Sequence, residues 1–241
     1  MKNLLLFLVF ACTFSFSCLG SPVPFSPIVR NYSVLDYNAG NENWAVAQDE
    51  RGVMYFGNNS GLLRYDGSRW KLFPLPTSGI VRAVYVASDR RIYVGSFEEF
   101  GYFEQNDLNL LEYHSLKEQV KGFDFHNDEI WTIVEQGGNI IFQSFGSYFI
   151  YDGKGTKGVR CPELPLNLFR IGDTLYSQLI NGGVCTFAGD KFIPLISRQD
   201  LGDSDVLAGL PYPGGMLLLT RNSGGYIHTS SGIRPLSLIH I

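Results

Sequence analysis

Short apolar segments alternate with turn residues over most of the chain. The stretch NWAVAQDERGVMYFGNNSGLLRYDGSRWKLFPL begins at Asn43 and contains four such segments, around Trp44 and Val46 and then at Val53–Phe56, Leu62–Tyr65 and Trp70–Leu75. The residues between them are rich in Gly, Asn and Asp, which adopt tight-turn conformations readily. Four antiparallel strands joined by tight turns form one blade of a β-propeller, provided that the unit repeats.

The unit repeats along the chain in the same strand order. Its second strand recurs as Val53–Gly57, Arg91–Gly95, Asn139–Gln143, Thr174–Gln178 and Gly215–Leu219. These copies are about 40 residues apart, near the period of known propeller blades. We therefore predict an all-β fold, a β-propeller of four-stranded antiparallel blades. About five blades are expected, at residues 43–76, 79–116, 129–163, 166–196 and 205–235. A β-sandwich with irregular hairpins is the alternative.

The first 20 residues have the pattern of a secretory signal peptide. Lys2 supplies a positive charge, Leu4–Phe16 is an apolar segment too short to span a bilayer comfortably, and Cys18-Leu19-Gly20 has the small residues of a cleavage site. A lipoprotein signal at Cys18 and an uncleaved anchor are the alternatives. We expect export, so that the folded part functions outside the cytoplasm.

Residues 21–42 form a lead-in whose first part is rich in proline and therefore extended. Within it, residues 28–37 alternate weakly between apolar and polar positions, which predicts a strand. Propellers commonly close the ring with an N-terminal strand in the last blade. Five blades and one such strand would leave the ring incomplete, with open sheet edges that natural propellers avoid by closure.

The last six residues, 236–241, are set apart from the fold. LSLIHI is the translation of CTG-TCT-CTT-ATA-CAC-ATC, the end sequence of a transposase-based sequencing adapter. We expect this tail to be derived from the adapter, with the natural sequence cut off before it. A natural apolar strand is the alternative.

Composition and charge exclude some functions. The formal net charge is −4 and no basic stripe is present, which argues against nucleic-acid binding by this segment. No catalytic residues, metal ligands or cofactor-binding motif can be assigned. Cys161 and Cys185 lie in neighbouring predicted blades, and a disulfide between them is left open.

One position in the predicted fold suggests a binding site. The first strand of each blade lines the central channel, and ligands commonly bind at its entrance. Asn43, Trp44, Arg82 and Trp131 fall at or near the starts of first strands. An aromatic face with planar polar groups suits a sugar ring, through apolar stacking and directional hydrogen bonds. Packing of the two tryptophans between blades is the alternative.

The first repeat resembles the two-component regulator propeller repeat. The resemblance rests on an acidic turn with Gly, a strand ending in Gly, a Gly-Leu pair and a closing Tyr-Asp-Gly. These are Asp49 and Gly52, Gly57, Gly61-Leu62 and Tyr65-Asp66-Gly67. Later repeats match less well, so the specificity of the resemblance rests mainly on residues 31–67.

This resemblance implies a periplasmic sensor from a signal-transduction or transcription regulator. Such propellers precede a triple-tyrosine β-sandwich, a membrane helix and a cytoplasmic output, and many sense glycan fragments. We therefore expect a glycan ligand and a full-length protein that is a homodimer. We expect membrane attachment only through C-terminal parts outside this chain, and no enzymatic activity in this segment. The alternatives are an exported propeller hydrolase or lyase acting on polysaccharide, and a scaffold for protein–protein contacts.

Overall fold

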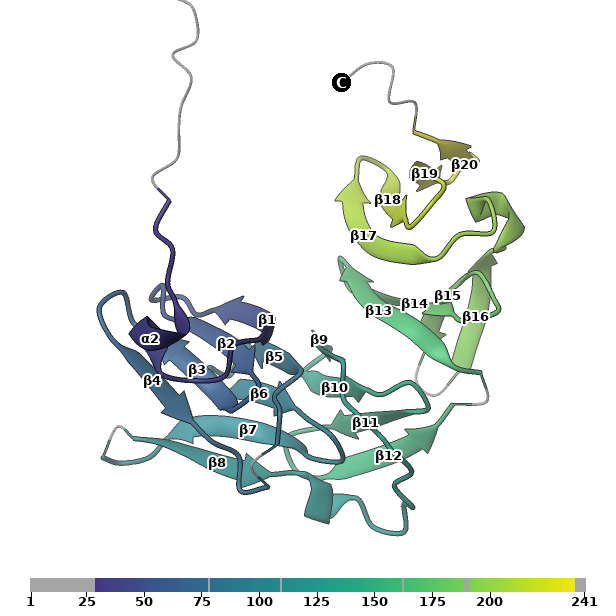
Figure 1. Ribbon diagram of the computed structural model, residues 1–241. Helices are drawn as coiled ribbons and strands as arrows, with labels where there is room; N and C mark the ends of the chain where they lie inside the picture. Colours follow the sequence, from purple (N-terminus) through teal and green to yellow (C-terminus); the bar gives the residue numbers. More distant parts are fainter. Residues whose placement is uncertain (1–28, 78, 109, 162, 189–190, 237–241) are drawn as a thin grey trace, which may run out of the picture. The chain divides into compact units, whose positions relative to one another are not determined.

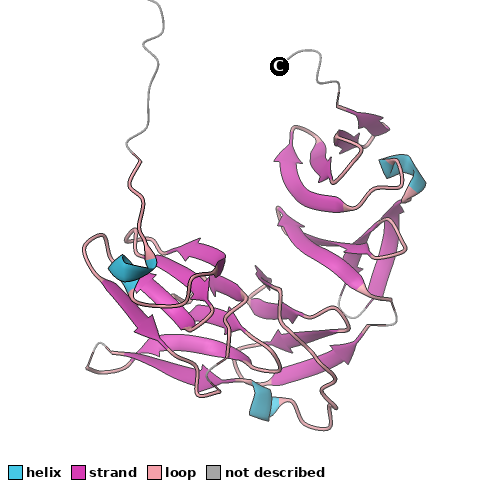
Figure 2. Cartoon of the chain, in the orientation of Figure 1, coloured by secondary structure: helices cyan, strands magenta, loops and turns pink. Residues whose placement is uncertain are grey.

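The computed structural model describes residues 29–236, apart from positions 78, 109, 162 and 189–190. Within these residues the chain forms five four-stranded antiparallel sheets (Figure 1). Strands dominate the described residues, and the helical segments among them are short (Figure 2). In each sheet four consecutive strands lie in chain order, as tight hairpins require.

The strands have the following bounds. The first sheet contains β1 (Asn43–Gln48), β2 (Met54–Asn58), β3 (Gly61–Tyr65) and β4 (Trp70–Phe73). The second contains β5 (Ala83–Val86), β6 (Ile92–Gly95), β7 (Phe100–Gln105) and β8 (Leu111–Ser115). The third contains β9 (Thr132–Gln136), β10 (Asn139–Gln143), β11 (Ser147–Tyr151) and β12 (Thr156–Arg160). The fourth contains β13 (Pro165–Ile171), β14 (Thr174–Leu179), β15 (Val184–Ala188) and β16 (Lys191–Ile196). The fifth contains β17 (Val206–Tyr212), β18 (Gly215–Thr220), β19 (Gly225–Thr229) and β20 (Gly232–Pro235).

Consecutive sheets contact each other through their first strands. β1 contacts β5, β5 contacts β9, β9 contacts β13, and β13 contacts β17. Within the described part of the chain, β17 and β1 make no comparable contact. The sheets are therefore blades of a β-propeller with an incomplete ring, which confirms the predicted fold class.

The core lies between neighbouring blades. Leu62 of the first blade and Val94 of the second belong to one buried cluster, together with Val81 in the connection between the blades. Phe100 of the second blade and Phe142 of the third belong to the next cluster, with ring centroids 4.8 Å apart. Each blade thus buries its apolar faces against its neighbours, as stacked repeats require.

A buried polar residue recurs at the end of the second strand of each blade. The five residues are Asn58, Ser96, Gln143, Gln178 and Thr220. Four of them bond to the segment that begins the next blade. The carbonyl groups of Asn58 and Ser96 accept hydrogen bonds from the backbone N–H groups of Val81 and Ile130. The amide side chain of Gln143 donates to the carbonyl of Pro165, and that of Gln178 accepts from the N–H of Val206. We call these four contacts the blade latches.

The N-terminal lead-in differs from the prediction. Within the described residues 29–42, the only regular element is the short helix α2 (Val34–Tyr37), so the strand expected at residues 28–37 is not present there. The ring of Tyr37 packs against Trp70 of β4, with centroids 5.5 Å apart. This contact with the first blade replaces the expected pairing with the last blade, whose four strands come only from residues 206–235.

Two short 3₁₀ helices, η1 (Lys117–Gln119) and η2 (Gln199–Leu201), lie between blades. No helix among the described residues has the length and apolar character needed to cross a membrane. The predicted signal peptide lies outside the described residues, as does the tail except for Leu236.

Cys161 and Cys185 are both free thiols. Burial raises the pKa of Cys161 to about 12 and that of Cys185 to about 11. Both thiols are therefore protonated at neutral pH, and a protonated thiol is a poor nucleophile.

Candidate functional site

Trp44 is positioned by an irregularity in β1. Asn43 pairs with Asn58 and Ala45 pairs with Gly57, so that Trp44 is the extra residue of a β-bulge. A bulge turns a side chain out of the regular alternation of a strand. The side chain of Trp44 remains 43% exposed. The same irregularity occurs where β13 and β17 begin, so the bulge belongs to the blade design and is not special to this site.

Arg82 lies between the two tryptophans predicted for the site. Its guanidinium carbon is 3.8 Å from the ring centroid of Trp44 and 5.3 Å from that of Trp131. The two indole rings are 6.4 Å apart and nearly perpendicular. Such stacking of a guanidinium on indole faces is a favourable cation–π arrangement. Trp44, Arg82 and Trp131 come from three different blades, and we call them the Trp–Arg–Trp cluster.

Glu129 neutralises the charge of this cluster. Its Oε1 accepts a hydrogen bond from Nε of Arg82 at 2.7 Å, and the Arg82 side chain is only 15% exposed. Two buried donors, Nη1 of Arg82 and Nε1 of Trp131, have no hydrogen-bond partner among the described residues. Arg82 is thus fixed by stacking on the tryptophans and by the Glu129 carboxylate, and its Nη1 remains a hydrogen-bond donor without a partner among the described residues.

Asn43, the fourth predicted residue, is held by its neighbours. Its Oδ1 accepts a hydrogen bond from Nδ2 of Asn58 at 2.9 Å. The same nitrogen also donates to the carbonyl groups of Gly40 and Glu42. Asn43 thereby helps to fix the segment that enters β1. A direct contact of Asn43 with a ligand stays a prediction.

Three further residues belong to the site and were not identified from the sequence. The first is Glu129. The second is Asn59, whose Oδ1 accepts from Nε1 of Trp44 at 2.7 Å. The third is Phe145, which is 43% exposed and packs on Trp131 with ring centroids 5.7 Å apart. Asn59 and Phe145 both come shortly after the second strand of their blade, and this repeated position is the sequence signal that could have identified them.

The cluster combines aromatic and polar groups. It offers exposed aromatic faces, a fixed guanidinium and amide groups within one region of the fold. Among the residues that the structure describes, no group of three or more His, Cys, Asp or Glu side chains could hold a metal ion.

Comparison with known proteins supports the fold but shows no family. No family model matches the chain, and no curated protein matches its sequence. Virginiamycin B lyase from Staphylococcus aureus is similar in structure, with a TM-score of 0.63 and 11% identity over 82% of this chain and 70% of that protein. A streptogramin B lyase gives a TM-score of 0.60 at 15% identity, over 87% of this chain and 72% of that one.

A second kind of structural neighbour is a sensor. The extracellular domain of a hybrid two-component system from B. thetaiotaomicron gives a TM-score of 0.61 at 17% identity. The match covers 84% of this chain and only 28% of that domain. The present chain thus spans little more than a quarter of the sensor domain, and at this identity the likeness concerns the fold.

These neighbours correct one expectation. The sequence led us to expect a segment without enzymatic activity, yet structures with this fold include virginiamycin B lyase and streptogramin B lyase, which are enzymes. The exclusion of catalysis is therefore withdrawn, since one propeller fold serves both enzymes and sensors.

Proposed function

We propose that the chain is the ligand-sensing, extracytoplasmic propeller of a bacterial signal-transduction regulator, and that a neutral sugar ring binds on the exposed face of Trp44. The observation that carries this proposal is the stacking of Arg82 on Trp44 and Trp131. Stacking holds the indole of Trp44 in place while 43% of the residue remains exposed. A fixed, exposed indole is a suitable platform for the apolar face of a sugar.

The charge balance favours a neutral sugar over an acidic one. Glu129 already pairs with Arg82. Glu42 lies nearby, because its Oε2 accepts a hydrogen bond from Nδ2 of Asn59 at 3.1 Å. A uronic acid or sulfated sugar would meet these two carboxylates with no unpaired positive charge to offset them.

The location and the assembly are part of the same proposal. We propose that the folded domain is periplasmic, consistent with the signal-like residues 1–20 and with the extracellular sensor domain among the structural neighbours. Ligand binding would act on the output through a homodimer of the full-length protein, by shifting a two-state equilibrium.

Fluorescence titration tests the binding step. Trp44 and Trp131 are two of the three tryptophans of the chain, so a bound sugar should change the intrinsic emission. We expect xylohexaose or mannohexaose to bind, and hexagalacturonate to bind at least roughly tenfold more weakly. Trp44→Ala should weaken binding roughly tenfold or more because the stacking surface is lost.

Leu207→Ala is the matched control. Leu207 is the bulged residue of β17, is 54% exposed, and occupies in the fifth blade the position of Trp44 in the first. Binding should be unchanged in this variant. Equal affinity of the wild type and Trp44→Ala, or no binding of either neutral sugar, would refute the proposal. Shorter products in the titrated sample would favour the alternative of an exported polysaccharide hydrolase or lyase.

A further inference from the structure

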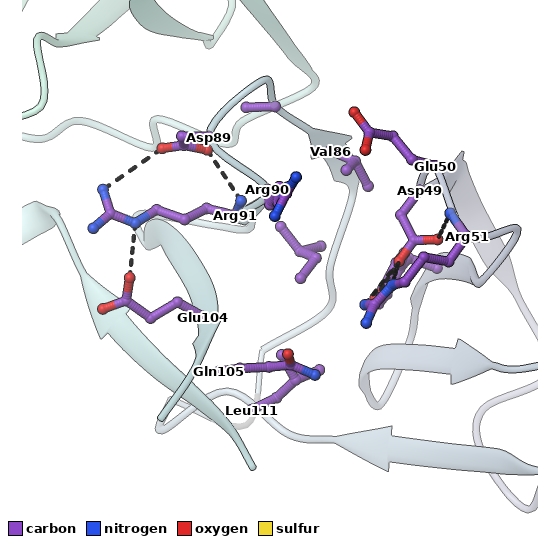
Figure 3. Close-up of a pocket in the computed structure, with 13 residues that line it drawn as sticks. Asp49, Glu50, Arg51, Val86, Asp89, Arg90, Arg91, Glu104, Gln105 and Leu111 are labelled. Carbon is purple, nitrogen blue, oxygen red and sulfur yellow. Dashed lines mark hydrogen bonds and ion pairs between the residues drawn. The ribbon is translucent and has the colours of Figure 1, made fainter. Parts of the chain in front are cut away.

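A polar cavity of about 460 Å³ lies between the first two blades, lined by parts of the chain other than the Trp–Arg–Trp cluster. Its walls are the turn between β1 and β2, residues 49–51, and the turn between β5 and β6, residues 87–91. Four carboxylate and three guanidinium side chains line it (Figure 3): Asp49, Glu50, Asp89, Glu104, Arg51, Arg90 and Arg91. Its volume is in the range of small-molecule binding sites.

Five of these charged groups are committed to one another. Arg51 donates to Asp49 through Nη2 at 3.1 Å and Nε at 3.3 Å. Arg91 donates to Glu104 through Nε at 2.8 Å and lies 3.6 Å from Asp89 through Nη1. These ion pairs fix the walls of the cavity, and they leave only two of the seven charged side chains without an ion-pair partner among the described residues.

Asp49 illustrates how firmly the walls are built. Burial acts to raise the pKa of its carboxyl, but hydrogen bonds from the backbone N–H of Val53 and from Arg51 outweigh this, and the pKa lies below its ordinary value. The backbone N–H groups of both Arg51 and Val53 donate to its Oδ1 at 2.9 Å. Asp49 is therefore ionised and held within its own turn.

Glu50 and Arg90 remain. Neither forms an ion pair with another described residue. They come from the facing turns of two blades, so one wall presents a free carboxylate and the other a free guanidinium (Figure 3). A ligand that satisfies both must carry a positive and a negative group.

Apart from Gln105, the uncharged lining is mainly apolar. Ile92 and Tyr55 are buried members of the core cluster between the two blades, and Val86 and Leu111 pack against that cluster. A ligand side chain without charge can therefore cover this surface and be removed from water.

We propose that this cavity binds an α-amino acid with an apolar side chain. The ligand ammonium pairs with Glu50, its carboxylate pairs with Arg90, and its side chain contacts Ile92 and Leu111. A simple anion would meet four carboxylates against three guanidinium groups, and a simple amine would leave Arg90 unpaired. A zwitterion leaves the charge balance of the cavity unchanged and pairs both free groups.

Isothermal titration of the purified protein with L-leucine tests this. Two analogues separate the charges: 4-methylpentanoate lacks the ammonium, and 3-methylbutylamine lacks the carboxylate. We expect L-leucine to bind and each analogue to bind at least about tenfold more weakly, the loss typical of one charged hydrogen bond. Arg90→Gln and Glu50→Gln should each weaken L-leucine binding by a similar factor.

Two exposed residues outside the cavity supply matched controls, Arg234→Gln and Glu118→Gln, and neither should change the affinity. Trp44→Ala should also leave L-leucine binding intact, which separates this inference from the proposed sugar site. The inference is overturned if L-leucine does not bind, if either analogue binds as tightly, or if the Arg90 and Glu50 variants bind like the wild type. Loss of L-leucine binding in Trp44→Ala would equally overturn it, since binding would then occur elsewhere.

Discussion

Gly61 shows how one residue without a side chain determines a local conformation. It begins β3 with φ of +132°, in a region that L side chains rarely adopt. A Cβ built at this position would lie 2.5 Å from the carbonyl oxygen of Phe73 and 2.8 Å from Cα of Pro74. The turn between β2 and β3 and the path of the chain after β4 therefore both depend on glycine at this position.

We expect Gly61→Val to lower the free energy of unfolding by about 3 kcal/mol, since it adds backbone strain to a clash with main-chain atoms. Urea denaturation measures the loss. Gly155→Val is the control, because Gly155 has no positive φ and a Cβ there would meet nothing within 4 Å. Equal stability of the two variants would show that Gly61 is not constrained in this way.

Sequence reasoning predicted part of the candidate site at this scale. Trp44, Arg82 and Trp131 were identified because each lies at the start of a first strand, and the structure brings them together. Glu129 and Asn59 were missed. Their contacts depend on the side-chain rotamers and on the distance between blades, which the repeat pattern does not contain.

At the scale of the secondary-structure element, Asn58 holds the segment that enters β1. Its side chain makes five hydrogen bonds and is completely buried. The donors to Oδ1 are the N–H groups of Gly40 and Ser60, and the two hydrogens of Nδ2 are shared among three acceptors, the carbonyl groups of Gly40 and Glu42 and Oδ1 of Asn43. A buried amide whose whole hydrogen-bonding capacity is used specifies one local conformation.

Asn58→Leu should destabilise the protein by about 3 kcal/mol, because it leaves several buried or half-buried backbone groups unpaired. The same variant should increase amide hydrogen exchange in residues 38–43. Asn139→Leu is the control, as the Asn139 side chain lies at a hairpin and is only half-buried. Unchanged exchange in the entering segment would contradict the role given to Asn58.

Strand positions followed from the sequence more closely than the lead-in did. Apolar alternation with Gly-rich turns is local information, and it was sufficient for the five four-stranded blades. Helix α2 has only four residues and no buried side chain of its own. Its conformation depends on tertiary packing, including the contact between Tyr37 and Trp70, so weak alternation within residues 28–37 pointed to a strand instead.

For the whole molecule, export is the property that the proposed function requires first. We expect the protein made in a Gram-negative bacterium to be released by osmotic shock with its N-terminus at Ser21, after removal of residues 1–20. N-terminal sequencing of the released protein measures this. Lys2→Glu together with Leu6→Asp should keep the chain in the cytoplasm. Retention of Met1 in the wild-type protein would contradict cleavage.

The blade latches have a consequence for how a propeller of this kind can evolve by duplication or exchange of blades. The four latches use three arrangements: a backbone carbonyl at Asn58 and Ser96, an amide nitrogen at Gln143 and an amide oxygen at Gln178. The first two latches use main-chain atoms and do not depend on the side chain, whereas the third and fourth need a side-chain amide. Since a glutamine amide carries both a donor and an acceptor, rotating it pairs it with either a carbonyl or an N–H group of the following blade. A blade that keeps glutamine at this position can therefore be duplicated or exchanged without losing the hydrogen bond to its new neighbour.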